Sequence, residues 1–392
     1  MSARIVLVVP AQEREDVLNI RLGGLDLCRR LVYTAAKAGI EEVVFLSSRP
    51  DRLPRVVAPG KILPGVGSLA ETPDTLYLLL APDYLPDAAF LSDLAATIRD
   101  TGPCVTRNSR MLAACNHRQL MEVAHIVAGP GGVPQAADHL AESHGLPAVV
   151  VRRGMLYRLS EPTDPAFVER ALFSSLVKET EGFMSRHVER RLSLALSRRL
   201  VNTRVTPNQM TLVSVFIGLF GALLIALGGR GWQTAGALLF LAHSILDGCD
   251  GEIARIKFME SRLGGILDFW GDNVVHAAVF YAIGHAWWRA TGSPWPLVPA
   301  ALAVTGTFAA ASLVYLKTMR ARKSGGPMYS SLAPDGDRSA MARMADYLSR
   351  RDFIYLVVIL AAFGHLNWFL LLTAVGAPVF SLVLARMYFH RK

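Results

Sequence analysis

Four regularly spaced aspartates are the residues of this sequence best suited to chemistry. Asp247 and Asp250 lie in segment 246–255, and Asp268 and Asp272 follow it. On a helix, residues three or four positions apart share a face, so each pair forms a stripe. Carboxylates gathered from two such stripes repel one another unless cations neutralise them. Oxygen ligands select hard divalent ions, Mg²⁺ or Mn²⁺, which bridge substrate phosphates, so we expect a nucleotide diphosphate as the guest.

Small residues accompany the aspartates at helical spacing, namely Gly251, Ala254 and Gly264. They allow a second helix or a nucleotide to approach the backbone closely. The stretches around them are apolar, and charged groups inside a membrane span are costly unless they face protein, water or ions. The aspartates therefore indicate a functional site.

Long apolar helices must position this site. The 392 residues are 52% hydrophobic with a mean hydropathy of +0.33, which is more apolar than an average soluble protein. Charges are frequent up to about residue 180, whereas long uncharged stretches dominate from Met210 onward. A hydrocarbon core about 30 Å thick needs roughly 20 apolar residues per helix. We expect six spans: 210–228, 232–255, 263–288, 295–317 and two within 353–387, the fifth somewhat short, with a turn at 364–367.

The basic residues predict the orientation of these spans. The formal charge is +9, and the positive residues gather beside apolar spans, which favours anionic lipid and phosphate substrates over nucleic acid. Lysines and arginines mark alternate loops, whereas the intervening turns hold only Arg230 and Arg289. The positive-inside rule then places both termini of an integral inner-membrane protein in the cytoplasm. The apolar run 5–10 is too short for a secretory signal, which agrees with a cytoplasmic amino-terminal domain.

The first part of the chain has the pattern of an α/β domain. Strands are expected at 4–9, 42–46, 75–80 and 148–151, with helices at 25–38 and about 135–143, which indicates an open α/β sheet. The four cysteines lack zinc-ligand spacing, so free thiols are expected. Segment 179–204 predicts a basic amphipathic helix lying in the membrane interface; an ordinary solvated helix at a domain boundary is the alternative.

The motif D-x-x-D-G-x-x-A-R, eight residues, then G-x-x-x-D-x-x-x-D resembles the signature of the CDP-alcohol phosphotransferase (CDP-alcohol phosphatidyltransferase) family. Its fixed positions here are Asp247, Asp250, Gly251, Ala254, Arg255, Gly264, Asp268 and Asp272. The resemblance implies a membrane transferase of phospholipid or related phosphodiester biosynthesis, which displaces CMP from a CDP-linked donor. It also implies two divalent ions, Mg²⁺ or Mn²⁺, on the four aspartates, with Asp272 as the base for the acceptor hydroxyl. Gly251, Ala254, Arg255 and Gly264 would surround the cytidine diphosphate, and a homodimer is expected because dimers are common among relatives.

Further positions carry weaker expectations. Asn208 and Thr211 match a family pattern near the nucleotide, although a purely structural helix cap explains them equally well. An acceptor phosphate would suit arginine, and three arginines lie at the expected cytoplasmic edge, where the positive-inside bias also explains them: Arg262, Arg320 and Arg351. Three histidines within the spans are expected to pack or to form hydrogen bonds rather than bind metal: His243, His276 and His285.

Segments 181–186, 206–212, 246–255 and 351–356 support a further resemblance of the whole chain, strongest over residues 180–285, to bifunctional enzymes in which an inositol-1-phosphate cytidylyltransferase domain precedes a di-myo-inositol-phosphate phosphate synthase. The front half departs from them because segment 9–15 has no glycine to hold a triphosphate. Asp83 matches their first metal aspartate, but segment 157–160 lacks the second. The resemblance implies a nucleotidyltransferase-like fold over 1–178 that makes no CDP-alcohol and serves regulation, docking or weak nucleotide binding. The interfacial helix 179–204 and a transmembrane transferase domain over 205–392 follow.

Several functions remain open at this point. The donor is CDP-diacylglycerol or CDP-inositol, and the acceptor is an alcohol such as a phosphorylated polyol. An ion-coupled transporter is the alternative from a different class, since intramembrane carboxylates also line ion pathways. A membrane scaffold without activity is a third reading, which the intact aspartate set disfavours.

Overall fold

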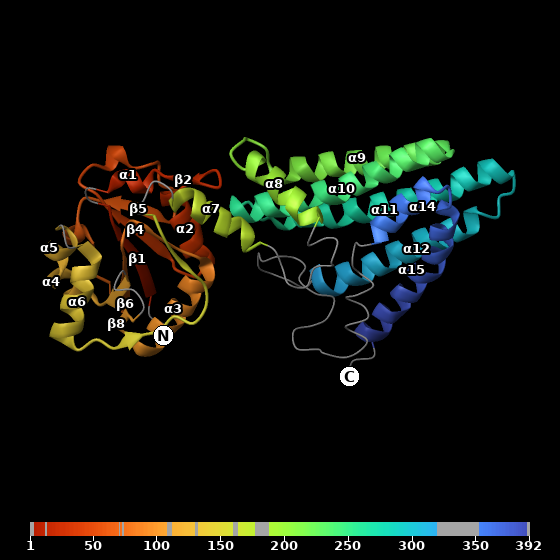
Figure 1. The fold of residues 1–392 in the computed structure, drawn as a ribbon. Coiled ribbons are helices and arrows are strands. Elements are labelled where there is room, and N and C mark those ends of the chain that lie inside the picture. Colours follow the sequence, from red (N-terminus) through yellow and green to blue (C-terminus); the bar gives the residue numbers. More distant parts are fainter. Residues whose placement is uncertain are drawn as a thin grey trace. The chain divides into compact units, whose positions relative to one another are not determined.

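The computed structural model describes residues 4–11, 14–69, 71–72, 74–107, 112–129, 132–159, 164–176, 188–319 and 353–389. The chain divides into two compact units, residues 1–172 and 173–392. The division lies close to the boundary expected from the sequence after residue 178. The first unit is mixed α/β and the second is helical (Figure 1).

A seven-stranded mixed sheet forms the centre of the first unit, in the order β10-β8-β9-β6-β1-β4-β5. Its strands are β1 (Arg4–Pro10), β4 (Glu42–Leu46), β5 (Gly60–Leu63), β6 (Thr75–Leu80), β8 (Cys104–Thr106), β9 (Leu112–Cys115) and β10 (Ala148–Val149). Strand β1 runs parallel to both β4 and β6, and β9 is antiparallel to both β6 and β8. Six of the seven residues of β1 are buried, as expected for a central strand covered on both faces.

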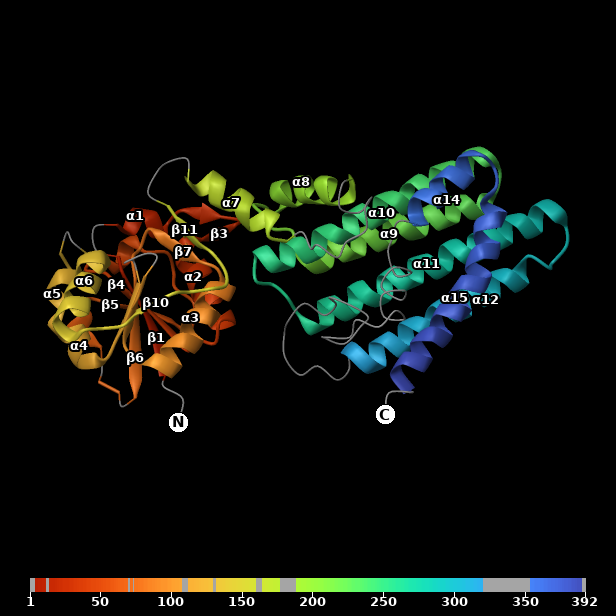
Figure 2. The ribbon, with the colours of Figure 1, turned by 60° about the horizontal axis from the view of Figure 1, so that its bottom comes forward.

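Helices cover both faces of this sheet. In both ribbon views α2 (Leu27–Lys37) and α3 (Ala88–Thr101) lie on one side, and α4 (His117–Glu122), α5 (Ala124–Val127) and α6 (Gly132–His144) lie on the other (Figures 1 and 2). Two small ribbons flank the sheet, β2–β3 (Arg21–Leu22 and Leu25–Asp26) and β7–β11 (Tyr84–Pro86 and Leu156–Arg158). Helices α1 (Glu15–Leu18) and α7 (Asp164–Ser174) complete the elements.

The open α/β sheet expected from the sequence is present, with two differences. The helix expected over 25–38 begins only at Leu27, because Asp26 caps it by accepting a hydrogen bond from the Arg29 backbone N–H. Strands β8 and β9 were not predicted, because runs of three and four residues carry no readable alternation.

Six helices follow the short helix α8 in the described part of the second unit. Helix α8 spans Arg190–Leu200. The six that follow are α9 (Pro207–Leu227), α10 (Arg230–Ile256), α11 (Arg262–Thr291), α12 (Leu297–Val314), α14 (Phe353–Ala362) and α15 (Leu366–Phe389). Helix α12 continues into a π-helical turn, Tyr315–Met319. The turn expected at 364–367 is present, since Gly364 adopts a positive φ between α14 and α15.

Among the described residues, three helices are long and apolar enough to cross a membrane by length and composition: Pro207–Leu227, Leu297–Lys317 and Leu366–Met387. Six spans were expected. Helices α10 and α11 have the length, but they carry the aspartates and other charged residues that lower their hydropathy. Helix α14 is apolar but has only 10 residues.

Glycines bring α9 and α10 into close backbone contact. A Cβ atom built on Gly221 would lie 2.7 Å from the Gly236 carbonyl oxygen, and one on Gly236 would collide with the Gly221 carbonyl. Only glycine permits this approach, which is the way membrane helices commonly pack. Helix α10 therefore has a fixed position against α9, and α10 also packs against α8 and α14.

Helix α8 covers part of the segment 179–204 that the sequence predicts as an interfacial helix, and residues 179–187 of that segment lie outside the described residues. Its small polar residues Ser193 and Ser197 are buried, whereas Leu192 is half-exposed beside the exposed Arg191 and Arg199. The serines allow α8 to lie close to α10, where the Cys249 thiol contacts the Ser193 carbonyl. The outward face thus combines an apolar residue with basic ones.

Candidate metal centre and nucleotide site

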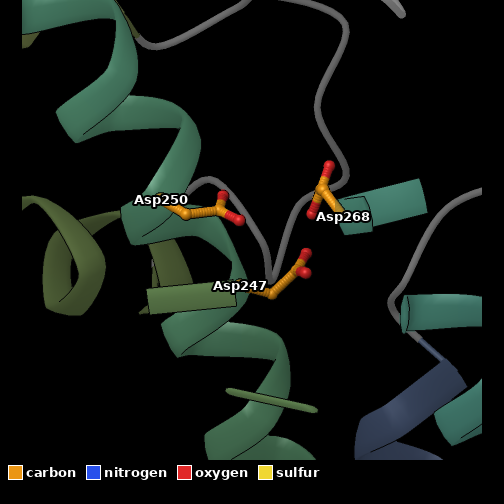
Figure 3. Close-up of side chains that lie close together, drawn as sticks. All are labelled: Asp247, Asp250 and Asp268. Atoms are coloured by element: carbon orange, nitrogen blue, oxygen red, sulfur yellow. The ribbon is translucent and has the colours of Figure 1, made fainter. Parts of the chain in front are cut away.

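Three of the four predicted aspartates converge in the structure. Asp247 and Asp250 lie on α10, Asp268 lies on α11, and one carboxylate oxygen from each falls within 4.8 Å of the others. The three carboxyl groups turn toward one another across the gap between the helices (Figure 3). Asp247 and Asp250 are buried and Asp268 is partly exposed. Within the described residues this is the cluster whose spacing could hold a metal ion.

Capping residues fix where the helices of this site begin. Thr206 forms a capping box with Gln209 at the start of α9, as the T-P-N-Q sequence predicts. At the start of α11, the Ser261 hydroxyl accepts a hydrogen bond from the Gly264 backbone N–H. Helix α11 therefore starts six positions before Asp268 and presents it toward α10.

Thr211 supports one of the aspartates from α9. Its side chain is buried, and its hydroxyl donates a hydrogen bond to the Asp250 carboxylate. The Pro207 carbonyl, 3.3 Å away, is the alternative acceptor on its own helix. A donor at this position fixes the orientation of the Asp250 carboxylate, a contact that neither the nucleotide role nor the helix-cap role expected for Thr211 from the sequence includes.

Asp272 lies outside the three-carboxylate group and faces two histidines instead. Its Oδ1 is 3.4 Å from Nε2 of His243 and 3.9 Å from Nδ1 of His276. His243 is fully buried, and its Nδ1 lies 3.0 Å from the Ser214 carbonyl oxygen. A carbonyl only accepts hydrogen bonds, so Nδ1 carries a proton and Nε2 is the atom presented to Asp272.

The residues predicted to surround the nucleotide form two small groups. Asn208 on α9 faces Gly264 on α11, where an added Cβ would lie 2.8 Å from the asparagine Oδ1. Arg255 folds back along α10, and its Nε donates to the Gly251 carbonyl at 2.8 Å. Asn208 is exposed, and Ala254 and Arg255 are half-buried, so these side chains are accessible to a ligand.

Only one of the predicted acceptor arginines can be located. Arg262 is exposed at the first position of α11. Arg320 and Arg351 lie outside the described residues. His285 contacts the rings of Tyr281 and Trp288, as expected for a packed histidine.

His243 forms the hydrogen bond that the sequence predicted, but its position beside Asp272 and the burial of Glu252 were not predicted. His243 lies one turn before Asp247 on the same stripe of α10, and this spacing was the available signal for a role beside the aspartates. Glu252 is fully buried on the opposite side of α10, where its Oε1 accepts from Arg190 Nη1 at 2.8 Å and from the Ser193 hydroxyl at 2.7 Å. Only the structure could reveal that α8 covers this carboxylate.

The donor set fits a hard divalent cation. All three converging groups are carboxylates, two of them are buried, and carboxylates this close together are favourable when a cation lies between them. A group of this kind can bind Mg²⁺ or Mn²⁺ together with phosphate oxygens.

Comparison with known proteins agrees with this chemistry. Residues 204–334 match the family model of CDP-alcohol phosphatidyltransferase. The bifunctional IPC transferase and DIPP synthase of Archaeoglobus fulgidus is 41% identical over 135 residues, which are 33% of this chain and 26% of that protein. The phosphatidylinositol phosphate synthase of Corynebacterium glutamicum is 30% identical over 144 residues, 36% of this chain and 63% of that protein.

These matches cover only part of each relative, from about a quarter to less than two thirds of its length. A crystal structure of the phosphatidylinositol phosphate synthase of Mycobacterium tuberculosis has 21% identity and a TM-score of 0.34, over 50% of this chain and 93% of that one. The aspartate motif and the family match cover the same helices, α10 and α11. Residues 204–334 of this chain therefore resemble the CDP-alcohol phosphatidyltransferase family over the helices that carry the aspartates.

Proposed function

We propose that this chain transfers a substituted phosphate from a CDP-linked donor to the hydroxyl of an alcohol and releases CMP. The observation that carries the proposal is the convergence of Asp247, Asp250 and Asp268 within a segment that matches the transferase family. The donor is CDP-diacylglycerol or CDP-inositol, and the acceptor is a phosphorylated polyol. The product is a phospholipid or a related phosphodiester.

The converging aspartates would hold the cations of the reaction, two ions of Mg²⁺ or Mn²⁺, with Asp272 as an additional ligand. When bound, these ions neutralise the charge of the pyrophosphate and stabilise the departing phosphate. Thr211 keeps the Asp250 carboxylate oriented for this task, since its buried hydroxyl donates to that group.

Asp272 would act as the base. The acceptor oxygen forms a new bond to the phosphorus that carries the donor's alcohol, and the bond from that phosphorus to the bridging oxygen breaks. CMP leaves with the electron pair, and the acceptor proton passes to the Asp272 carboxylate. His243 would hold that carboxylate in place in the form in which Nε2, 3.4 Å from Oδ1, carries a proton as well as Nδ1.

The remaining residues would bind the substrates. Asn208, Gly251, Ala254, Arg255 and Gly264 contact the cytidine diphosphate, which their exposure and close spacing support. The exposed guanidinium of Arg262 binds the acceptor phosphate, and from their positions in the sequence we assign the same role to Arg320 and Arg351.

The protein would be integral to the inner membrane. The three long apolar helices support this placement. We extend it to six spans with both termini in the cytoplasm, a homodimer, and α8 in the interface with Arg191, Leu192 and Arg199 facing anionic lipid. The amino-terminal unit keeps a nucleotidyltransferase-like fold without that activity.

CMP release tests the proposal. The full chain in detergent, with Mg²⁺ or Mn²⁺, is offered CDP-diacylglycerol or CDP-inositol together with inositol phosphate or glycerol phosphate. We expect CMP from one pair, its loss in Asp272→Asn, and its retention in the matched variant Asp51→Asn, which changes an exposed aspartate of the other unit. CMP from none of the pairs, together with cation flux in liposomes, would favour a transporter.

A further inference from the structure

A second charged cluster lies in the amino-terminal unit, at the carboxyl end of its central strands. After β1 the chain forms β4, which lies next to β1 in the sheet. After β6 it forms β8 and β9, which lie beyond β6, away from β1. Strands β1 and β6 are parallel neighbours, so their carboxyl ends form a topological switch point. Open α/β sheets bind their ligands in the crevice at such points.

Three charged side chains meet there. Arg14 follows β1, Asp83 follows β6, and Arg158 ends β11. Oδ2 of Asp83 lies 4.0 Å from Nη2 of Arg14 and 3.9 Å from Nε of Arg158. One carboxylate oxygen therefore has a guanidinium on each of two sides, and the three groups together carry a net charge of +1.

The backbone fixes two members of this cluster. Arg158 pairs with Tyr84 across the β7–β11 ribbon, and the Leu159 N–H donates to the Asp83 carbonyl at 2.7 Å. The Asp83 side chain is 13% exposed, whereas those of Arg14 and Arg158 are 46% and 63% exposed. The carboxylate is thus at the base of the cluster, and both guanidiniums remain accessible to a ligand from solvent.

The neighbouring groups agree with this placement. Burial raises the pKa of the Tyr84 hydroxyl, Arg158 lowers it and Asp83 raises it further, so the phenol lies in the field of both charges. Glu15, which follows Arg14 in the sequence, is buried and accepts a hydrogen bond from the Ser47 hydroxyl at 3.0 Å, so its charge is directed toward the end of β4.

We propose that Arg14 and Arg158 form a binding site for a phosphate-bearing small molecule, which the amino-terminal unit holds without a divalent cation. At a metal-dependent phosphate site an aspartate would bind the ion that neutralises the ligand. Here two guanidiniums flank the aspartate, and their planar forks match phosphate oxygens directly. The two arginines neutralise the charge of the ligand. Asp83 lies between their guanidinium groups and separates them.

Binding in the presence of EDTA tests this site, because chelation removes the ions on which nucleotide binding in the other unit depends. The full chain in detergent is titrated with CMP and with inorganic phosphate by calorimetry. We expect saturable binding in the presence of EDTA. Mn²⁺ should not increase the affinity of the site in the amino-terminal unit. Equal affinities for the two probes indicate recognition of phosphate alone, and a higher affinity for CMP indicates a nucleotide ligand.

Matched variants locate the binding. Arg14→Gln and Arg158→Gln should each weaken it about tenfold through the loss of charge-assisted hydrogen bonds. Arg4→Gln is the control, because Arg4 is equally exposed at the opposite end of β1 and pairs with Glu41 and Glu42. Asp83→Asn should tighten binding, since it removes the competing carboxylate, and a folding defect would not produce a gain. Absence of binding to the wild type, or full binding by the double arginine variant, would overturn the proposal.

Discussion

His243 on α10 presents its Nε2 to Asp272 on α11 at 3.4 Å, while its Nδ1 donates to the Ser214 carbonyl on α9 at 3.0 Å. One buried imidazole therefore connects three helices at the position of the proposed base. A Cβ on Gly218 would lie 3.0 Å from Cγ of His243, so the glycine provides the space for this ring. The histidine has a defined orientation before any substrate binds.

Replacing His243 should lower turnover more than substrate affinity. Glutamine places its amide near the position of Nε2 and keeps a contact to Asp272, whereas asparagine places it near Nδ1 and keeps only the bond to Ser214. We expect His243→Asn to reduce kcat for CMP release about 10- to 100-fold, the usual cost of losing an outer partner of a site carboxylate. His243→Gln should retain more activity, with KM for the CDP-linked donor nearly unchanged in both. Equal activity of the two variants would contradict a positioning role.

Thr211→Val should weaken metal binding. Valine has nearly the same shape but cannot donate to the Asp250 carboxylate, so the ligand loses its fixed orientation. The Mn²⁺ concentration that half-saturates CMP release should rise about 10-fold or more, and Thr211→Ser should restore it. Thr305→Val is the control, since that exposed hydroxyl bonds only within α12.

The sequence allowed prediction of the main elements and of the aspartate cluster because both depend on local spacing. Strands β1, β4 and β6 are continuous apolar runs, and the motif places Asp247, Asp250 and Asp268 on facing helix stripes. Short strands such as β8 and β9 form only because a neighbouring strand offers an edge to pair with, β6 for β9 and β9 for β8, which local spacing cannot encode.

The partners of the site residues depend on helix packing and could not be read from the sequence. Asp272 follows Asp268 by one turn, yet it faces His243. The imidazole of this α10 residue is held next to Asp272 by its contact with the Ser214 carbonyl on α9. Likewise, Thr211 reaches Asp250 because the Gly221–Gly236 contact draws α9 against α10. The motif predicts which residues matter, and the packing decides what each one contacts.

The buried thiols of the amino-terminal unit should resist alkylation in the native protein. Burial raises the pKa of Cys28 and Cys115 to about 12 and that of Cys104 to about 11. The reactive thiolate is therefore scarce at pH 8, and the side chains are also inaccessible. Maleimide should leave all three unmodified until denaturant is added, as mass spectrometry can establish. Rapid native modification of any of them would contradict the structure.

Because burial raises the pKa of these three thiols in the folded protein, we expect the amino-terminal unit to lose stability at alkaline pH. The folded state keeps these protons, while the unfolded state releases them near pH 8.5, so the stabilisation is complete below that pH and declines as pH rises toward 11 to 12. Hydrogen exchange of β1 amides between pH 8 and 10.5, corrected for the intrinsic rate, should report the decline. Replacing all three cysteines by alanine should reduce its slope. Tyr84 and Tyr157, whose pKa values burial also raises, account for the slope that remains.

The Arg190–Glu252 pair should hold α8 against α10. Glu252 is fully buried and the Arg190 side chain is 19% exposed, so removing the cation leaves an unpaired charge in an apolar contact. We expect Arg190→Met to cost about 3 to 5 kcal/mol in the free energy of unfolding, as for other broken buried pairs. Thermal unfolding in detergent, followed by loss of the monodisperse gel-filtration peak, measures the change.

The double variant separates the charge from the packing of this contact. Arg190→Met with Glu252→Met replaces the pair by apolar side chains of similar length, and such replacements are often neutral or stabilising. We therefore expect it to recover most of the stability lost in Arg190→Met alone. Arg199→Met, at an exposed position of the same helix, should have little effect. If the double variant were as unstable as the single one, the Ser193 hydrogen bond and the close packing of α8, rather than the ion pair, would hold the two helices together.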